Sequence, residues 1–178
     1  MSILKIARMG HPVLRIKARL VESRELKTVA LQKLIDDMID TMHEYSGVGL
    51  AAPQVHESLR IFVATLGGED GAGEPTVIIN PEITSVGTEV MEGWEGCLSI
   101  PDIRGRVPRM QRIVLRALSR EGKRLEIDAH DFPARLIQHE NDHLDGVLFF
   151  DRMRSLGTLS FMEEFSKYHA QQDEDEEG

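Results

Sequence analysis

The stretch His139–His143, read as His-Glu-Asn-Asp-His, constrains the fold of this chain more than any other. Its two imidazoles stand four residues apart, and residues i and i+4 share one face of an α-helix with about 3.6 residues per turn. On a helix both rings can bind one metal ion, with the Glu140 carboxylate close to a water molecule that the ion holds. The pattern is typical of metal-assisted hydrolysis, and it requires a helix packed against a core.

The flanking residues predict such a helix over about 132–145. Asp131 suits the N-cap position, Pro133 suits the first helical turn, and Gly146 suits the C′ position after the last turn. The apolar contacts that anchor this helix in the core are expected from Leu136, Ile137 and Leu144. The metal site should therefore lie in the core rather than on a loop.

Length and composition indicate an ordinary globular protein. The chain has 178 residues, of which 41% are hydrophobic, and this suits one domain with a sizeable core. No apolar run approaches the roughly 20 residues that span a bilayer, and the N-terminus lacks the apolar segment of a secretory signal. A single cysteine excludes an internal disulfide. We therefore expect a cytoplasmic protein with no membrane partner, whose lone thiol is available as a ligand.

The charge is negative overall and unevenly distributed. A formal net charge of -9 argues against a general nucleic-acid binder, so we expect no direct sequence-specific nucleic-acid binding. The acidic run Asp173–Glu177 predicts a disordered tail over 171–178, after a single domain over 1–170. Residues 104–124 are rich in arginine. We expect strand residues that face solvent there, and the alternative is a basic rim that contacts an anionic partner.

The remaining pattern predicts an α+β fold: one domain of short, mostly antiparallel strands around the metal-bearing helix. Apolar residues recur at spacings of three and four between Thr28 and Tyr45, which indicates an early amphipathic helix capped by Thr28. Pro81 and Gly87 are expected to interrupt the strands near them. Strands are expected at 61–65, 77–80, 83–86, 88–91, 113–118 and 125–129, the last two as a hairpin, and a C-terminal helix at 156–170.

The third metal ligand has two candidates. A catalytic site normally takes three protein ligands and leaves one position open. Cys97 offers a thiolate from a loop or strand end. Glu163 lies 20 residues after His143, near the separation at which some zinc proteases place a glutamate on a following helix, although Met162 stands where such proteases normally have asparagine. These residues leave three interpretations open. They are a metalloprotease with Glu163 as ligand, a different metal hydrolase, and a non-catalytic metal-stabilised module.

Three stretches together resemble the motifs of the peptide deformylase family. They are Gly47–Gln54 (GVGLAAPQ), Glu95–Ser99 (EGCLS) and Gln138–Gly146 (QHENDHLDG), and they occur in the family's order and at its spacing. Each motif alone is moderately specific, and the three together are very specific. The likeness extends from about residue 6 to residue 152. Many members end in a long basic helix, whereas this chain ends in acidic residues, which argues against a ribosome-docking role for its C-terminus.

The resemblance implies a ligand set and a mechanism. The metal ligands would be Cys97, His139 and His143, with Fe(II) as the ion in the cell and Zn(II), Ni(II) or Co(II) in isolated protein. Glu140 would move a proton from water to the leaving amine. The donors to the oxyanion would be the side-chain amide of Gln54 and the backbone N–H of Leu98.

The resemblance also implies the substrate, which is the N-formyl-methionyl end of a nascent peptide, with formate as one product. An extended peptide would bind by strand addition along Val48 and Gly49. An apolar pocket near Val48, Leu136 and His139 would receive the methionine side chain. Glu95 and Arg104 match further residues near the family's site, and we expect them to form a charge pair that braces its wall. We expect a monomer that contacts the ribosome transiently at most.

Overall fold

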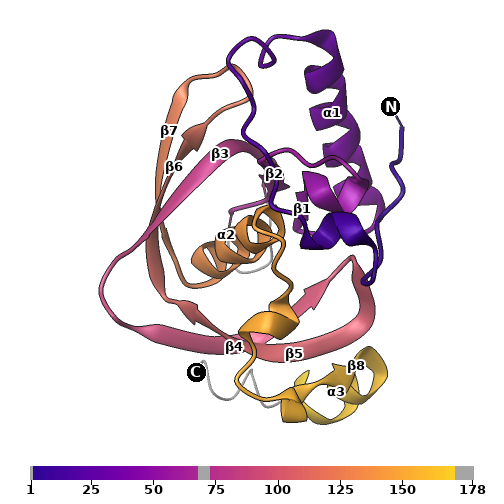
Figure 1. Cartoon of the computed structure of the whole chain (residues 1–178). Helices are drawn as coiled ribbons and strands as arrows, with labels where there is room; N and C mark the ends of the chain where they lie inside the picture. Colours follow the sequence, from indigo (N-terminus) through magenta and orange to yellow (C-terminus); the bar gives the residue numbers. More distant parts are fainter. Residues whose placement is uncertain (1, 68–72, 171–178) are drawn as a thin grey trace.

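Helix α2 (Asp131–Leu144), which carries the paired histidines, lies between two antiparallel sheets in the computed structural model (Figure 1). The structure describes residues 2–67 and 73–170, so the acidic tail expected over 171–178 lies outside the described residues. The five-stranded sheet has the order β1-β2-β3-β6-β7, and the three-stranded sheet has the order β4-β5-β8. The fold is α+β with antiparallel strands around the metal-bearing helix, as the sequence predicts.

The bounds of the remaining elements follow. The first sheet contains β1 (Gly49–Ala51), β2 (Ile61–Ala64), β3 (Thr76–Ser85), β6 (Arg112–Leu118) and β7 (Arg124–His130). The second contains β4 (Val90–Cys97), β5 (Ile100–Met110) and β8 (Ser160–Phe161). The other helices are α1 (Val29–Glu44) and α3 (Met162–Tyr168), and short 3-10 turns cover Pro12–Arg15, Ala52–Val55, Phe149–Arg152 and Leu156–Thr158.

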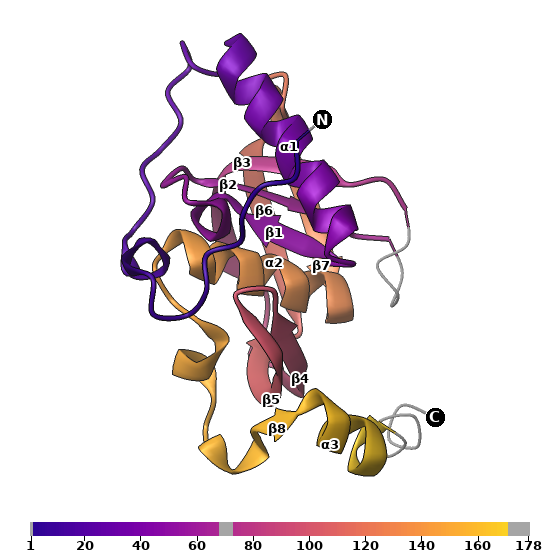
Figure 2. The ribbon, with the colours of Figure 1, turned by 90° about the vertical axis from the view of Figure 1, so that its right-hand side faces the viewer.

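Strand β2 is buried on both faces because a helix covers each of them. Successive strand residues point to opposite faces of a sheet. Ile61 and Val63 join the core cluster that contains α1, whereas Phe62 and Ala64 join the cluster that contains α2. Figure 2 shows the strands between the two helices. An uninterrupted apolar run at 61–64 is the sequence pattern that such two-sided burial requires.

The two long helices begin and end close to where the sequence predicts. The Thr28 hydroxyl accepts a hydrogen bond from the backbone N–H of Leu31 at 3.3 Å, so the predicted cap of α1 is confirmed. Helix α2 begins at Asp131 itself, with His130 in the N-cap position. Gly146, just after α2, has φ of +73°, and a Cβ there would come within 2.8 Å of the backbone of Arg15. Gly146 thus ends α2 and lets the N-terminal segment pass close by.

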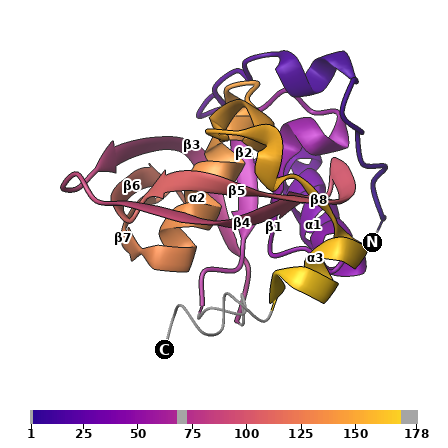
Figure 3. The ribbon, with the colours of Figure 1, turned by 90° about the horizontal axis from the view of Figure 1, so that it is seen from below.

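Three expected boundaries are wrong. The strands expected at 77–80 and 83–86 form the single strand β3, because a shift of register between Ile79 and Glu82 accommodates Pro81 without ending the pairing. The strand expected at 88–91 continues as β4 to Cys97 and pairs with β5, which the sequence did not reveal. The helix expected over 156–170 is a 3-10 turn, the short strand β8 and α3, which lie beside β5 (Figure 3).

The arginine-rich stretch 104–124 runs over β5, β6 and the turn after β6. The expectation of solvent-facing strand residues is confirmed for Arg112 and Arg116, whose side chains are about half exposed or more. Acidic partners neutralise much of this charge, through the ion pairs Arg112–Asp128, Arg116–Glu126 and Arg120–Asp36. Within residues 2–67 and 73–170, none of the helices has the length and apolar character needed to cross a bilayer.

The packing of β2 predicts a large effect on stability. Phe62 is fully buried between the sheet and α2, so Phe62→Ala should lower the free energy of unfolding by about 3–5 kcal/mol. The loss has two parts, because the substitution removes apolar contacts and leaves a cavity. Denaturant unfolding at a fixed metal concentration measures this. Phe161→Ala, at a position that is 66% exposed, is the matched control and should change stability by about 0.5 kcal/mol or less. Equal effects of the two changes would contradict this core assignment.

Candidate metal centre and active-site pocket

Three potential metal ligands converge at one point. One ligand atom from each of Cys97, His139 and His143 lies within 4.8 Å of the other two, and this is the one such group of His, Cys or acidic residues in the part of the chain that the structure describes. The sulfur of Cys97 is 3.3 Å from Nε2 of His143. The two imidazole rings stand 5.1 Å apart, at 77° to each other. A thiolate and two imidazoles in this arrangement suit a divalent transition-metal ion, so the donor set fits the metal that the sequence predicts.

Secondary structure explains this convergence. His139 and His143 are one helical turn apart on α2. Cys97 is the last residue of β4, where the register against β5 shifts between Gly96 and Cys97. This irregularity falls at the tight end of the β4–β5 hairpin, which lies against α2 (Figure 1). A strand end supplies the sulfur and a helix supplies both nitrogens.

The surroundings of Cys97 favour the thiolate. Burial by itself would raise the pKa of the thiol, but the neighbouring charge of His143 and hydrogen bonds from His139 and His143 lower the pKa of Cys97 well below its usual value. The thiolate is the form of cysteine that binds metal ions. The site thus stabilises the ligand in its metal-binding form.

Glu95 orients one of the histidines. Its carboxylate is 4% exposed, and Nδ1 of His139 lies 2.8 Å from Oε2 of Glu95. With that nitrogen donating to the carboxylate, the other ring nitrogen of His139 is left for the ligand cluster. Arg109 donates to both carboxylate oxygens, at 2.9 and 3.0 Å, and Arg135 donates to Oε1 at 3.0 Å. Burial opposes ionisation of Glu95, yet Arg109 and His139 hold its pKa well below the usual range.

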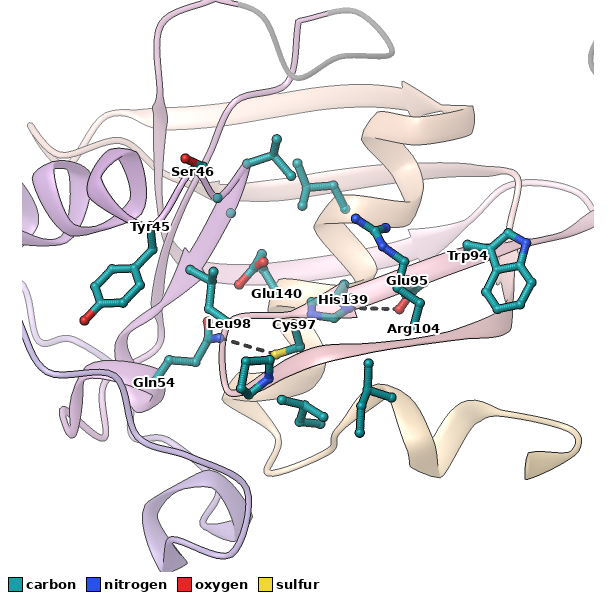
Figure 4. Close-up of a pocket in the computed structure, with 18 of the residues that line it drawn as sticks. Tyr45, Ser46, Gln54, Trp94, Glu95, Cys97, Leu98, Arg104, His139 and Glu140 are labelled. Atoms are coloured by element: carbon teal, nitrogen blue, oxygen red, sulfur yellow. Dashed lines mark hydrogen bonds and ion pairs between the residues drawn. The ribbon is translucent and has the colours of Figure 1, made fainter. Parts of the chain in front are cut away.

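Arg104 has a different position from the one expected. Glu95 pairs with Arg109 and Arg135, whereas Arg104 lines the pocket without an ion pair to Glu95 among the contacts described (Figure 4). Nε of Arg104 is 3.1 Å from the sulfur of Met162, and its guanidinium lies 5.3 Å from the ring centre of Phe165. Arg104 thus connects β5 to α3 instead of bracing Glu95.

Sequence reasoning missed Arg109, Arg135 and Asp142. Arg109 also donates to Asp142, and Asp142 accepts two further hydrogen bonds from Arg152, at 3.1 and 2.8 Å. The buried positions 105, 107 and 109 alternate along β5, so this arginine faces inward with Val107, but the sequence alone does not reveal β5 or its inward face. Arg135 has no sequence signal either, because a charged residue on a helix normally faces solvent.

Glu140 is buried beside the ligands with one oxygen unpartnered. Among the described residues, no hydrogen-bond donor accompanies its Oε2. Burial raises the pKa of Glu140 to about 7. Gly49 of β1 lies directly against it, because a Cβ at Gly49 would be 2.3 Å from Oε1 of Glu140 and 2.9 Å from Leu136. Any side chain at position 49 would therefore displace the carboxylate.

Gln54 presents its amide nitrogen to the cluster. Its Oε1 accepts a hydrogen bond from the backbone N–H of Ala51 at 2.8 Å, which fixes the orientation of the amide. Its Nε2 is 3.5 Å from the sulfur of Cys97 and 3.3 Å from the hydroxyl of Ser99 (Figure 4). Leu98 follows Cys97 at the hairpin end and lines the same pocket.

One pocket of about 500 Å³ is lined by Gln54, Glu95, Cys97, Leu98, Arg104, Arg135, His139 and Glu140. Val48, Gly49, Leu136 and Met162 are also in its wall. Glu163 lies outside the ligand cluster: its side chain is 77% exposed and pairs with Lys167. This position contradicts the protease alternative, in which Glu163 would be the third metal ligand.

Comparisons with known proteins agree on one family. The family model described as polypeptide deformylase matches residues 3–158. Peptide deformylase 2 of Nostoc sp. is 46% identical over 165 residues, which are 89% of this chain and 91% of that protein. The crystal structure of peptide deformylase from Thermotoga maritima is 40% identical, with a TM-score of 0.80 over 87% of this chain and 100% of that one. The class I type b peptide deformylase of Acinetobacter baumannii, crystallised with Met-Ala-Ser bound, is 38% identical, with a TM-score of 0.80 over 85% of this chain and 99% of that one.

A match of this extent, at this level of identity and with residues from all three motifs lining one pocket, leaves no other assignment. The chain belongs to the polypeptide deformylase family, whose members are metal-dependent hydrolases that remove the formyl group from nascent peptides.

Proposed function

We propose that Cys97, His139 and His143 hold the catalytic metal ion and that Fe(II) is this ion in the cell, with Zn(II), Ni(II) or Co(II) taking its place in isolated protein. The observation that carries the proposal is the convergence of one sulfur and two imidazole nitrogens within 4.8 Å, beside a buried carboxylate. A divalent ion bound there would act as a Lewis acid that acidifies water and polarises the formyl carbonyl. Cellular availability selects among ions that suit such donors.

Glu140 is the proton carrier in this proposal. Its Oε2 is buried and has no partner among the described residues, so it is available to accept a proton from the attacking water. The same carboxyl group then delivers the proton to the leaving amine. A pKa of about 7, raised by burial, suits a group that both takes and gives a proton near neutral pH.

Gln54 and Leu98 stabilise the negative charge that develops on the formyl oxygen. The hydrogen bond from Ala51 holds the carbonyl end of the Gln54 amide, so its NH₂ group points toward the cluster. The backbone N–H of Leu98, which follows the ligand Cys97, is the second donor. Donors that are fixed before the reaction need no reorganisation when the charge appears, and losing one typically costs about 10²–10³ in rate.

The substrate peptide binds along the open edge of the five-stranded sheet. β1 is the edge strand of this sheet, so one side of Gly49 can pair with an added strand. Val48 and Leu136 line the part of the pocket that receives the methionine side chain. The Met-Ala-Ser peptide bound to the Acinetobacter baumannii enzyme supports this substrate class. The close contact between Gly49 and Glu140 supports the hypothesis that formyl fits and acetyl does not.

Three expectations stay predictions: a cytoplasmic location, a monomeric state and a transient contact with the ribosome.

Truncating a ligand tests the metal site. Cys97→Ala should abolish stoichiometric metal binding, because two imidazoles alone leave a site one ligand short. The measurement is metal content per chain, by elemental analysis after gel filtration. Glu163→Ala is the matched control for the protease alternative and should keep its metal, because this exposed carboxylate pairs only with Lys167 among the contacts described. If Glu163→Ala lost its metal and Cys97→Ala retained its metal, the proposed ligand set would be wrong.

Replacing the proton carrier separates catalysis from metal binding. Glu140→Gln should retain one metal ion per chain but lose about 10²–10⁴ in kcat, because the amide cannot take the proton from water. Formate release from a formyl-methionyl peptide gives kcat, and elemental analysis gives metal content. Glu164→Gln, a change in an exposed carboxylate on α3, is the control and should keep the wild-type rate. A kcat for Glu140→Gln within a few-fold of wild type would refute the role of this residue.

A further inference from the structure

One wall of the substrate pocket carries a buried cation. Arg135 lines the pocket together with apolar residues that include Val48, Phe132 and Leu136. Its side chain is only 8% exposed. Arg135 precedes the ligand His139 by four residues on α2, so it lies on the same helix face, about 6 Å further along the axis. Charged side chains are rarely buried, and this one shares the pocket with Val48 and Leu136, which the proposed function assigns to the methionine side chain.

Backbone carbonyls hold the guanidinium of Arg135 rigidly. One terminal nitrogen donates to the carbonyl of Val107 at 2.8 Å, to Glu95 at 3.0 Å and to the carbonyl of Gly93 at 3.3 Å. The other donates to the carbonyl of Met91 at 2.8 Å. A Cβ at Gly93 would lie 2.9–3.1 Å from three guanidinium atoms. The missing side chain at Gly93 therefore gives Arg135 its space, and β4 and β5 fix its position.

These contacts leave part of the hydrogen-bonding capacity of Arg135 unused. A guanidinium has five N–H donors. In the part of the chain that the structure describes, acceptors accompany the two terminal nitrogens, and none accompanies Nε. A guanidinium stays charged in proteins even when it is buried. Because Arg135 lines the pocket, we infer that a ligand atom that accepts hydrogen bonds can reach one of these remaining donors.

A methionine side chain has the length to reach Arg135. In the proposed complex the formyl carbon lies beside the ligand cluster, and the side chain starts at the next carbon of the substrate backbone. About 6 Å of helix rise separates His139 from the level of Arg135, and an extended methionine side chain has a similar length. The atoms near its sulfur would then be the ones that approach the guanidinium.

We propose that Arg135 is a specificity residue of this pocket and that it lets the chain deformylate peptides whose first residue is N-formyl-methionine sulfoxide. This inference rests on the proposed function. A thioether is a weak hydrogen-bond acceptor, whereas the oxygen of a sulfoxide is a strong one. In a purely apolar pocket, burying that oxygen without a partner would weaken binding by about 10- to 100-fold. A charge-assisted hydrogen bond from Arg135 offsets this loss.

Three peptides test the inference on the wild-type enzyme. They are formyl-Met-Ala-Ser, formyl-Met(sulfoxide)-Ala-Ser and formyl-norleucine-Ala-Ser, and kcat/KM is measured for each by formate release. We expect the sulfoxide peptide to react within about tenfold of the methionine peptide. A larger drop for the sulfoxide would overturn the inference, while normal turnover of the methionine peptide would show that the deformylase activity stands. Absence of formate from all three peptides would overturn both.

Substitution of Arg135 distinguishes specificity from bracing, since this residue also contacts Glu95. In Arg135→Met and Arg135→Lys, the ratio of kcat/KM for sulfoxide to that for methionine should fall at least tenfold. The ratio for norleucine to methionine should stay within about twofold. An equal fall for all three peptides would mean that Arg135 only positions Glu95, and it would overturn the inference. Circular dichroism and metal content check that each variant folds. If neither variant folds, the three kcat/KM values of the wild-type enzyme decide whether the inference stands.

Discussion

The buried carboxylate of Glu95 is the interaction on which the site depends. Three donor residues from two elements converge on it: Arg109 from β5, and Arg135 and His139 from α2. Glu95 itself belongs to β4, so one carboxylate ties the hairpin to the metal-bearing helix. An isolated buried charge is very costly, whereas one that is paired and fully hydrogen-bonded is tolerated. Each partner therefore needs the others, and the hairpin cannot shift without leaving a charge uncompensated.

The hydrogen bonds of this network fix the residues on either side of the proposed metal ligands. Glu95 fixes the ring of His139, and two residues further along β4 the chain reaches Cys97, the proposed sulfur ligand. One turn along α2 from His139, Asp142 accepts hydrogen bonds from Arg109 and from Arg152, which follows the helix. Residues that flank the ligands are thus held by charge pairs. On the pocket side, the cluster is flanked by Glu140, Gln54 and Gly49 of the edge strand β1.

The sequence predicted those elements that are set by neighbouring residues. The period of α1, its Thr28 cap and the β6–β7 hairpin follow from apolar spacing and turn residues. β5 escaped prediction because arginine, glycine and proline interrupt its alternation, and pairing with β4 stabilises it instead. Pro81 was expected to end a strand, but a bulge absorbs it. The C-terminal helix is short because the chain first adds β8 to the edge of β5.

For the candidate site, too, the sequence predicted what short motifs encode and missed what long-range contacts determine. The His139–His143 spacing predicts two ligands, and the resemblance to deformylases supplies Cys97 where local reasoning left Glu163 open. The roles of Arg109 and Arg135 depend on long-range contacts, and no pattern in the sequence separates a buried arginine on α2 from an exposed one. Arg104 was expected to pair with Glu95, but it lies against Met162 and Phe165 of α3, because β8 pairs with β5 and brings that helix next to the pocket.

The central claim is that this pocket hydrolyses a formyl group with a metal ion held by a thiolate and two imidazoles. The most direct measurement is formate release from formyl-Met-Ala-Ser by protein loaded anaerobically with Fe(II), with acetyl-Met-Ala-Ser as the control. The account predicts formate from the first peptide and no reaction with the second. Protein that holds one Fe(II) per chain yet releases no formate, or hydrolyses both peptides alike, would contradict it.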